Sequence, residues 1–226
     1  MESYYLAGLD LGQAADFTAL AVLERPHMST DNAAALFAVR HLRRYALGTP
    51  YTEIVPAVSQ LLAARPLAGR TTLVVDQTGV GRAVVDMLRR SAPCTVVPVT
   101  ITAGQNITVS EDGSRNVPKK ELVTCVQLLL QSRRLQIARS LCDAGVLVRE
   151  LENFRVRITA AARETFGAWR EGQHDDLVLA VALACWWGER GYYGPFEVTA
   201  DPSSRSLLAD IPEGVFLTKD LGLPPY

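Results

Sequence analysis

The alternation of hydrophobic and polar positions predicts a chain that begins with strands and then alternates strands with helices. Apolar runs rich in β-branched and aromatic residues predict strands at 4–11, 18–24 and 34–42, with short polar links suited to hairpins. The next predicted elements are a helix at 51–64, a strand at 71–76, a helix at 79–91 and a strand at 94–101.

The second half of the chain is predicted to be mainly helical. Asp112-Gly113 favours a β-hairpin turn or a loop, and Pro118 is placed to open a helix over the apolar stretch that follows it. The remaining predicted elements are a helix at 142–153, edge strands at 155–159 and 165–169, and a strongly apolar helix at 175–190.

This order of elements predicts an α/β fold. Strands joined by short links pair antiparallel, and strands that follow a helix pair parallel. We therefore expect a mixed sheet, three antiparallel strands followed by parallel strands, with helices on both faces. The chain of 226 residues is long enough for one such domain, predicted at residues 1–195. Residues 196–226 carry several prolines and are predicted to be a tail or docked arm.

Composition and charge limit the possible partners. The chain is 48% hydrophobic with a net charge of −1, so it has no overall attraction to a polyanion, and nucleic acid would need a local basic patch. The four cysteines form no C-x-x-C pair and are interpreted as reduced core thiols of a cytosolic protein. No signal peptide is visible, and the apolar run 177–187 is too short to cross a bilayer, so no membrane partner is expected.

Aspartates stand where the predicted strands end and the last helix begins. Asp10 lies in the first strand, Asp76 ends a buried strand, and Asp175 and Asp176 open the last helix. Ligands of open α/β sheets gather at strand ends, so these side chains are expected at one point. Several carboxylates at one site require a cation, and oxygen ligands favour Mg²⁺ or Mn²⁺. Two such ions can support a phosphoryl displacement.

Each aspartate also has a purely structural interpretation. Asp175 and Asp176 could cap a helix, and Asp16 and Asp76 could be turn residues. Asp10 is the hardest to explain in this way, because it lies between two leucines and a buried, unpaired carboxylate is costly. The combination of the aspartates is more informative than any one of them.

Three segments together resemble the nuclease domain of phage terminase large subunits. They are GLDLGQAADFTAL at 8–20, LVVDQTG at 73–79 and GQHDDLVLAVALA at 172–184. The segments occur in the order and approximate spacing of that family, and HDDLVLA is the most specific of them. The resemblance implies an RNase H-like fold and a metal-dependent endonuclease. Such an enzyme cuts double-stranded DNA with little sequence specificity and generates genome ends during viral DNA packaging.

The resemblance also implies roles for individual residues. Asp10, Asp76 and one or both of Asp175 and Asp176 would be catalytic metal ligands for two Mg²⁺ or Mn²⁺ ions, and Asp16 would serve the second ion. The implied partners are double-stranded DNA, the terminase ATPase domain, the small terminase and the portal, in the host cytoplasm. The chain has no G-x-x-x-x-G-K-[ST] loop, so ATP-driven translocation is not expected of it, and an isolated nuclease domain would be a monomer.

A basic segment offers a candidate DNA interface. Residues 115–139 contain six basic residues and one acidic residue, a net charge of +5. Contacts from such residues to phosphates would be sequence-tolerant and salt-sensitive, although a solvated helix face has the same composition. The candidate DNA-binding residues are Arg115, Lys119, Lys120, Arg133 and Arg134.

Three other classes of protein share parts of this pattern. A ribonuclease H or a Holliday-junction resolvase would use the same carboxylates, and substrate preference would separate them from a terminase nuclease. An actin-like ATPase also begins with an aspartate-glycine strand but needs two such domains, for which 226 residues are too few. A nucleic-acid-binding module would use the aspartates only for caps and turns, and would bind no divalent metal.

Overall fold

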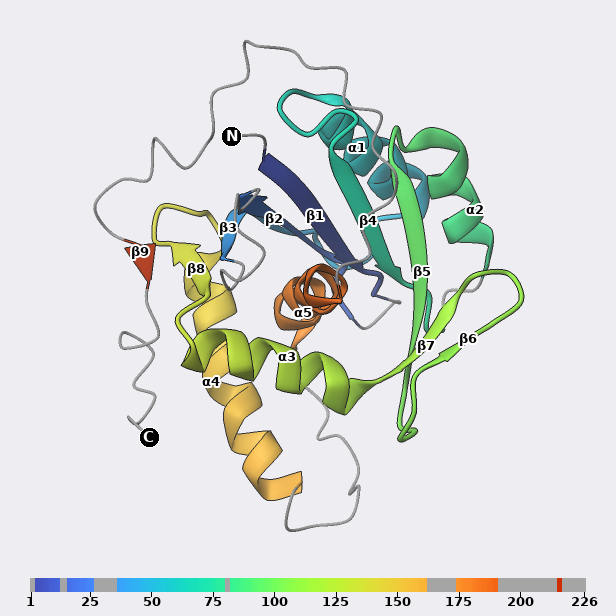
Figure 1. Ribbon diagram of the computed structural model, residues 1–226. Coiled ribbons are helices and arrows are strands. Elements are labelled where there is room, and N and C mark those ends of the chain that lie inside the picture. The colour runs from blue at the N-terminus through green and yellow to red at the C-terminus, as the bar shows by residue number, and fades with distance from the viewer. Residues whose placement is uncertain are drawn as a thin grey trace.

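The strands of the described residues form one mixed sheet, to which β9 adds a strand from near the C-terminus (Figure 1). The computed structural model describes residues 3–12, 16–26, 36–79, 82–161, 174–190 and 215–216. The first five strands are β1 (Ser3–Asp10), β2 (Ala19–Pro26), β3 (Phe37–Arg44), β4 (Thr71–Asp76) and β5 (Thr95–Thr102). The other four are β6 (Thr108–Val109), β7 (Arg115–Pro118), β8 (Leu135–Ala138) and β9 (Val215–Phe216). The helices are α1 (Tyr51–Ala63), α2 (Arg82–Ser91), α3 (Lys119–Gln131), α4 (Ala144–Ala161) and α5 (Asp176–Glu189).

The strand pairing confirms the predicted mixed sheet. The strand order is β6-β7-β5-β4-β1-β2-β3-β8-β9. β1, β2 and β3 form an antiparallel meander, whereas β4 is parallel to β1, β5 to β4 and β8 to β3. Leu9 of β1 lies opposite Val75 of β4, so the carboxyl ends of these two strands are adjacent. That adjacency brings the following residues, Asp10 and Asp76, to one edge.

Helices cover both faces of the sheet, as the sequence predicts. α1 and α2 pack on one face, and α3 and α5 lie on the other, with α5 against the middle of the sheet (Figure 1). Side chains of β1 alternate between the two cores: Tyr5, Ala7 and Leu9 join the α1–α2 core, and Leu6 joins the α5 core. Asp10 has the same parity as Leu6 and therefore faces the α5 side.

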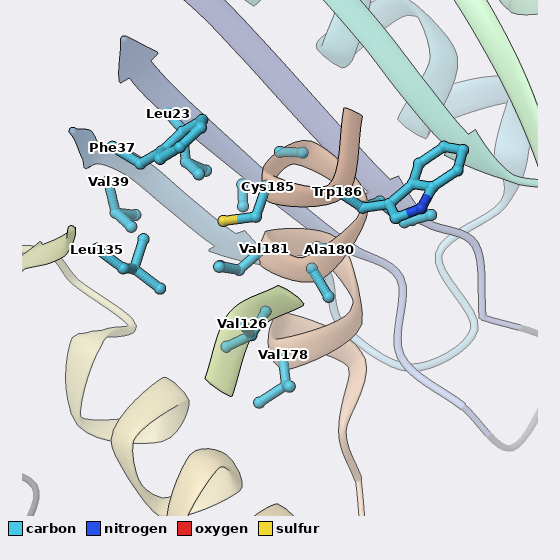
Figure 2. Packing of buried hydrophobic residues seen from close by; sticks show 14 of the residues in the cluster. Leu23, Phe37, Val39, Val126, Leu135, Val178, Ala180, Val181, Cys185 and Trp186 are labelled. Atoms are coloured by element: carbon cyan, nitrogen blue, oxygen red, sulfur yellow. The ribbon is translucent and has the colours of Figure 1, made fainter. Parts of the chain in front are cut away.

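Helix α5 is enclosed by the rest of the domain. Its residues from Asp176 to Gly188 are all buried, and Figure 2 shows side chains of β2, β3, β8 and α3 around it. Gly8 allows this close packing, because a Cβ atom there would lie 1.9 Å from the backbone oxygen of Ala180. The glycine of β1 thus sets how closely α5 approaches the strand that carries Asp10.

Three predictions about local structure need correction or remain open. Residues 155–159, predicted to be an edge strand, belong to α4, because no glycine or proline interrupts the helix after Gly145. The segment 165–169 and most of the predicted tail lie outside the described residues, and the assignment of residues 196–226 as a separate tail stays a prediction. Within that tail, Val215–Phe216 pairs antiparallel with β8, a strand that the sequence pattern did not reveal.

The hairpin and cysteine predictions have mixed outcomes. β6 and β7 pair antiparallel around Asp112-Gly113, which confirms the predicted hairpin. Cys185 is fully buried, but Cys142 is exposed and is therefore not a core thiol. None of the described helices is both long and apolar enough to cross a membrane.

Candidate functional site

Four aspartates from three elements meet at one edge of the sheet. Asp10 and Asp76 end the adjacent parallel strands β1 and β4, and Asp175 and Asp176 stand at the start of α5. All four are buried, with exposed fractions of 7%, 7%, 8% and 5% respectively. Burial of four carboxylates together is a strongly unfavourable arrangement unless protons or a cation compensate the charge.

The electrostatics of Asp10 show this crowding directly. Burial raises the pKa of Asp10 well above its usual range, and the charges of Asp76, Asp176 and Asp175 raise it further. Lys119 acts in the opposite direction. A hydrogen bond links the carboxyl groups of Asp10 and Asp76, so a protonated Asp10 can donate to Asp76 in the metal-free protein.

Thr78 orients the Asp76 carboxylate. Its backbone N–H donates to Asp76 Oδ1 at 2.8 Å, and its hydroxyl donates to the same oxygen. The hydroxyl in turn accepts the Ile101 N–H at 2.8 Å, which ties the turn after β4 to β5. Burial raises the pKa of Asp76, and the Thr78 hydrogen bonds oppose that shift. Thr78 was not among the predicted site residues, although the sequence shows an Asp-x-Thr turn after a buried strand.

Asp175 is paired with a lysine at the edge of the site. Lys119, the first residue of α3, places Nζ 2.9 Å from Asp175 Oδ2, and its side chain is 25% exposed. A residue predicted to contact DNA therefore lies against the carboxylates. Its ammonium group compensates part of their charge.

Asp176 faces a histidine and retains a carboxylate oxygen without a hydrogen bond. His174 Nδ1 lies 3.8 Å from Asp176 Oδ2, and within the described parts of the chain this buried oxygen has no hydrogen-bond partner. Burial raises the pKa of Asp176 to about 6, while His174 lowers it and Asp175 raises it. Asp16 is exposed, but it is near enough to raise the pKa of Asp176 slightly further, so it belongs to the rim of this site.

The start of α5 is capped by a residue that the sequence analysis missed. Asp175 occupies the N-cap position but makes no side-chain capping bond. Instead, Glu150 of α4 accepts the N–H groups of Leu177 at 3.0 Å and Val178 at 3.2 Å. The interpretation of the Asp pair as simple caps therefore has no support in the hydrogen bonding of Asp175. The available signal was that Glu150 adjoins Leu151 within the apolar stripe of α4.

Glu150 is itself perturbed by its surroundings. Burial raises its pKa to about 7, and the negative charge of Asp176 adds to the shift, whereas the two backbone N–H groups and Arg44 lower it. Arg44 Nη1 donates to Glu150 Oε1 at 3.0 Å. The carboxylate is thus held between a helix N-terminus and a guanidinium group.

The four aspartates provide suitable atoms for divalent cations. Their hard oxygen donors match the preference of Mg²⁺ and Mn²⁺, and the unpartnered oxygen of Asp176 is available for coordination. In the described residues, no three His, Cys, Asp or Glu side chains are already arranged around a common metal position. Asp175 and Asp76 are instead engaged by Lys119 and Thr78.

The basic residues fall into two groups rather than one continuous patch. Lys119 and Lys120 open α3 next to the carboxylates, and Lys120 donates to Gln105. Arg115, on β7, lies over the Trp187 ring with 4.6 Å from Cζ to the ring centroid. Lys119 contacts the carboxylates directly through Asp175, and the backbone of Arg115 lies in register with Asp76 through Val99 of β5.

The second basic group lies at the other end of α3. Arg133 is exposed and follows the helix, with a positive φ of 58°. Arg134 forms an ion pair with Glu189, with 3.0 Å between Nη1 and Oε2. The 13 residues of α3 place this group about 20 Å from Lys119, because a helix rises about 1.5 Å per residue.

The comparisons with solved structures identify the fold. The large terminase nuclease from thermophilic phage G20c aligns with a TM-score of 0.51 at 19% identity, covering 83% of each chain. A Mn-soaked human cytomegalovirus terminase nuclease domain aligns with a TM-score of 0.45 at 13% identity, covering 82% of this chain and 84% of that one. Thermus thermophilus RuvC aligns with a TM-score of 0.40 at 10% identity, covering 83% of this chain and 97% of that one.

The sequence comparisons identify the family. No match was found among curated protein sequences. Residues 7–185, most of the chain, match the family described as Terminase RNaseH-like domain. This span includes all three segments that carry the predicted resemblance and all four clustered aspartates, and the mixed sheet has the RNase H-like arrangement. The chain therefore belongs to the terminase RNaseH-like domain family.

Proposed function

We propose that this chain is a metal-dependent endonuclease that cuts double-stranded DNA with little sequence specificity. The observation that carries the proposal is the convergence of Asp10, Asp76, Asp175 and Asp176, all buried, in a member of a terminase nuclease family. Four mutually repelling carboxylates weaken the fold in the absence of cations, and a cation-dependent reaction explains why the chain keeps them together.

The proposed ligands are the carboxylates themselves. Asp10, Asp76 and one or both of Asp175 and Asp176 would hold two Mg²⁺ or Mn²⁺ ions, with Asp16 near the second position. When bound, such ions supply activation of a water molecule and neutralisation of charge on the phosphate and on the leaving 3′ oxygen. The carboxylates would hold the ions and orient them, and none of the carboxylates needs to act as a nucleophile.

The neighbouring residues would position the DNA. Lys119 and Lys120 border the carboxylates and can contact the phosphate at the cut or its neighbours. Arg115, Arg133 and Arg134 would contact the backbone farther away, with a salt-sensitive and sequence-tolerant contribution. In a packaging machine the further partners would be the ATPase domain, the small terminase and the portal, in the host cytoplasm.

Cleavage of supercoiled plasmid tests this proposal. Nicking and linearisation are expected with Mn²⁺ or Mg²⁺, none with EDTA, and loss of activity in Asp76→Asn. Asp86→Asn is the matched control, because Asp86 lies on α2 with a half-exposed side chain. Four-way junctions and RNA–DNA hybrids are the competing substrates, and preferential cleavage of either would replace the double-stranded DNA assignment. A folded protein that neither cuts DNA nor binds divalent metal would refute the proposal.

A further inference from the structure

Glu150 takes the hydrogen bonds that a helix N-cap residue normally makes. With Asp175 as the N-cap of α5, Leu177 and Val178 are the second and third residues of the helix. Their N–H groups are the ones that an N-cap side chain usually accepts. Here Glu150 accepts both with Oε2, from a different helix. The side chain of Asp175 is therefore not used for capping.

This exchange of partners matters because α5 starts inside the protein. The first N–H groups of a helix have no partner within the helix, and leaving them unsatisfied in a buried place is unfavourable. If the Asp175 or Asp176 carboxylate accepted these hydrogen bonds, it would be turned toward the helix and could not bind a cation. Glu150 satisfies them from α4, so neither aspartate carboxylate is needed for capping.

Arg44 holds Glu150 and also contacts the segments that flank the site. Its guanidinium donates to Glu150 Oε1 at 3.0 Å, and its backbone N–H donates to Asp143 Oδ2 at 2.9 Å. The same guanidinium lies over the Phe17 ring, 4.0 Å from the centroid, and Phe17 contacts the ring of His174 edge-on at 4.7 Å. Arg44 thus connects Glu150 of α4 to Phe17 and, through the Phe17 ring, to His174, which precedes the aspartate pair.

We propose that Glu150, held by Arg44, is a positioning residue that caps α5 in place of Asp175 and so keeps the Asp175 and Asp176 carboxylates turned away from the helix N–H groups and toward the metal site. This inference rests on the proposed metal-dependent function. Glu150 itself is not proposed as a ligand. It acts through the backbone of α5, and its removal would allow an Asp side chain to turn toward the vacated N–H groups.

The test compares Glu150→Ala, Glu150→Gln and the control Glu152→Ala, whose side chain is exposed on the same helix. Mn²⁺ affinity is measured by calorimetry below the melting range, and the melting temperature is recorded with and without Mn²⁺. Glu150→Ala is expected to weaken Mn²⁺ binding by about 10- to 100-fold, the usual cost of losing a residue that orients metal ligands. Glu150→Gln keeps an oxygen for the two N–H groups and is expected to restore part of the affinity, and Glu152→Ala to match the unmodified chain.

The two measurements separate positioning from stability. A residue with a merely structural role lowers the metal-free melting temperature but leaves the Mn²⁺-induced gain in the free energy of unfolding unchanged, because that gain depends only on affinity and concentration. Hydrogen exchange of the Leu177 and Val178 amides should accelerate in Glu150→Ala. If Glu150→Ala does not fold, Arg44→Met, which removes the guanidinium that holds Glu150, takes its place in the comparison.

The outcomes also separate this inference from the proposed function. Weakened Mn²⁺ binding in Glu150→Ala with partial rescue by Gln supports it. Mn²⁺ affinity equal to that of the unmodified chain, with only a lower melting temperature, overturns the positioning role and leaves the nuclease proposal intact. An unmodified chain that binds no Mn²⁺ overturns this inference, and if it also fails to cut DNA it overturns the nuclease proposal as well.

Discussion

The ammonium group of Lys119 lies 2.9 Å from the carboxylate of Asp175, so one ion pair joins the candidate DNA surface to the candidate metal site. A lysine at this position neutralises part of the carboxylate charge when no metal is present. It also competes with a metal for the same oxygen. The residue is therefore expected to affect metal binding and DNA binding in opposite directions.

Lys119→Met should tighten Mn²⁺ binding and weaken DNA binding. Loss of the ion pair frees Asp175, and partly exposed pairs contribute up to about 1 kcal/mol, which corresponds to an increase in affinity of about 2- to 5-fold. Calorimetry of Mn²⁺ binding and a salt-dependent DNA-binding assay measure the two effects. Lys120→Met is the control, since its ammonium group contacts Gln105, and it should weaken DNA binding alone. Unchanged or weaker Mn²⁺ binding in Lys119→Met would argue against competition.

Asp176→Asn should reduce Mn²⁺ affinity more than Asp175→Asn. Asp176 raises the pKa of Asp10 more than Asp175 does, and its Oδ2 has no hydrogen-bond partner among the described residues, whereas Asp175 is held by Lys119. The single substitutions are compared by calorimetry and by the Mn²⁺ concentration that supports half-maximal cleavage. The reverse order would make Asp175 the principal ligand.

The metal-free protein should be less stable at neutral pH than in mild acid. Burial raises the folded-state pKa of Asp176 to about 6 and that of Asp10 well above its usual range. Above about pH 4, and until these carboxyl groups ionise in the folded state, the folded state binds more protons than the unfolded state. The free energy of unfolding therefore falls as pH rises. Between about pH 5 and about pH 7.5 Asp176 alone should account for a loss on the order of 1 kcal/mol.

Calorimetric melting in EDTA at the two pH values measures this effect. Asp10→Asn should raise the metal-free melting temperature at neutral pH and remove most of the Mn²⁺-induced increase. A melting temperature that rises steadily with pH in EDTA would show that the carboxylates are already compensated without metal.

Thr78→Val should weaken metal binding, and with it DNA cleavage, while lowering the free energy of unfolding only slightly. The substitution removes the hydroxyl that donates to Asp76 and accepts from Ile101. Loss of an orienting hydrogen bond of this kind is expected to cost about 10-fold or more in metal affinity, and about 1 kcal/mol in the free energy of unfolding. Thr100→Val, which removes only the acceptor for the Gln77 side chain, is the control. Equal effects of the two substitutions on metal affinity would count against the role of Thr78.

Gly8→Ala should destabilise the whole domain. The added Cβ would meet the backbone oxygen of Ala180 at 1.9 Å, so β1 or α5 must shift, at a cost of about 1–3 kcal/mol or more. The displacement acts on α5 and should also weaken Mn²⁺ binding. Gly145→Ala on α4 is the matched control, because its Cβ would come no closer than 3.7 Å to a flexible arginine. Thermal melting of both variants measures the difference.

Much of the fold and of the carboxylate cluster could be predicted because short stretches of sequence specify the strands and place aspartates at their ends. Apolar runs mark the β1–β3 strands, and the apolar TTLVVD run is a strand with the predicted bounds. A carboxylate at the end of each of two adjacent parallel strands must lie at one edge of the sheet. Asp10 and Asp76 therefore follow from sequence and topology together. The prediction of a strand at 155–159 failed because the local pattern was ambiguous: a five-residue alternating run fits both a strand and a helix.

The sequence by itself determined which residues are acidic, that Asp76 ends its strand and that α5 is apolar enough to be buried. Only the tertiary structure decided which partners those residues meet. Glu150 caps a helix that begins 26 positions later, and Lys119 pairs with a carboxylate 56 positions away. Such contacts depend on how helices pack over a sheet. No periodicity of the chain records that packing, because side-chain periodicity specifies the buried face of an element but not the neighbour that covers it.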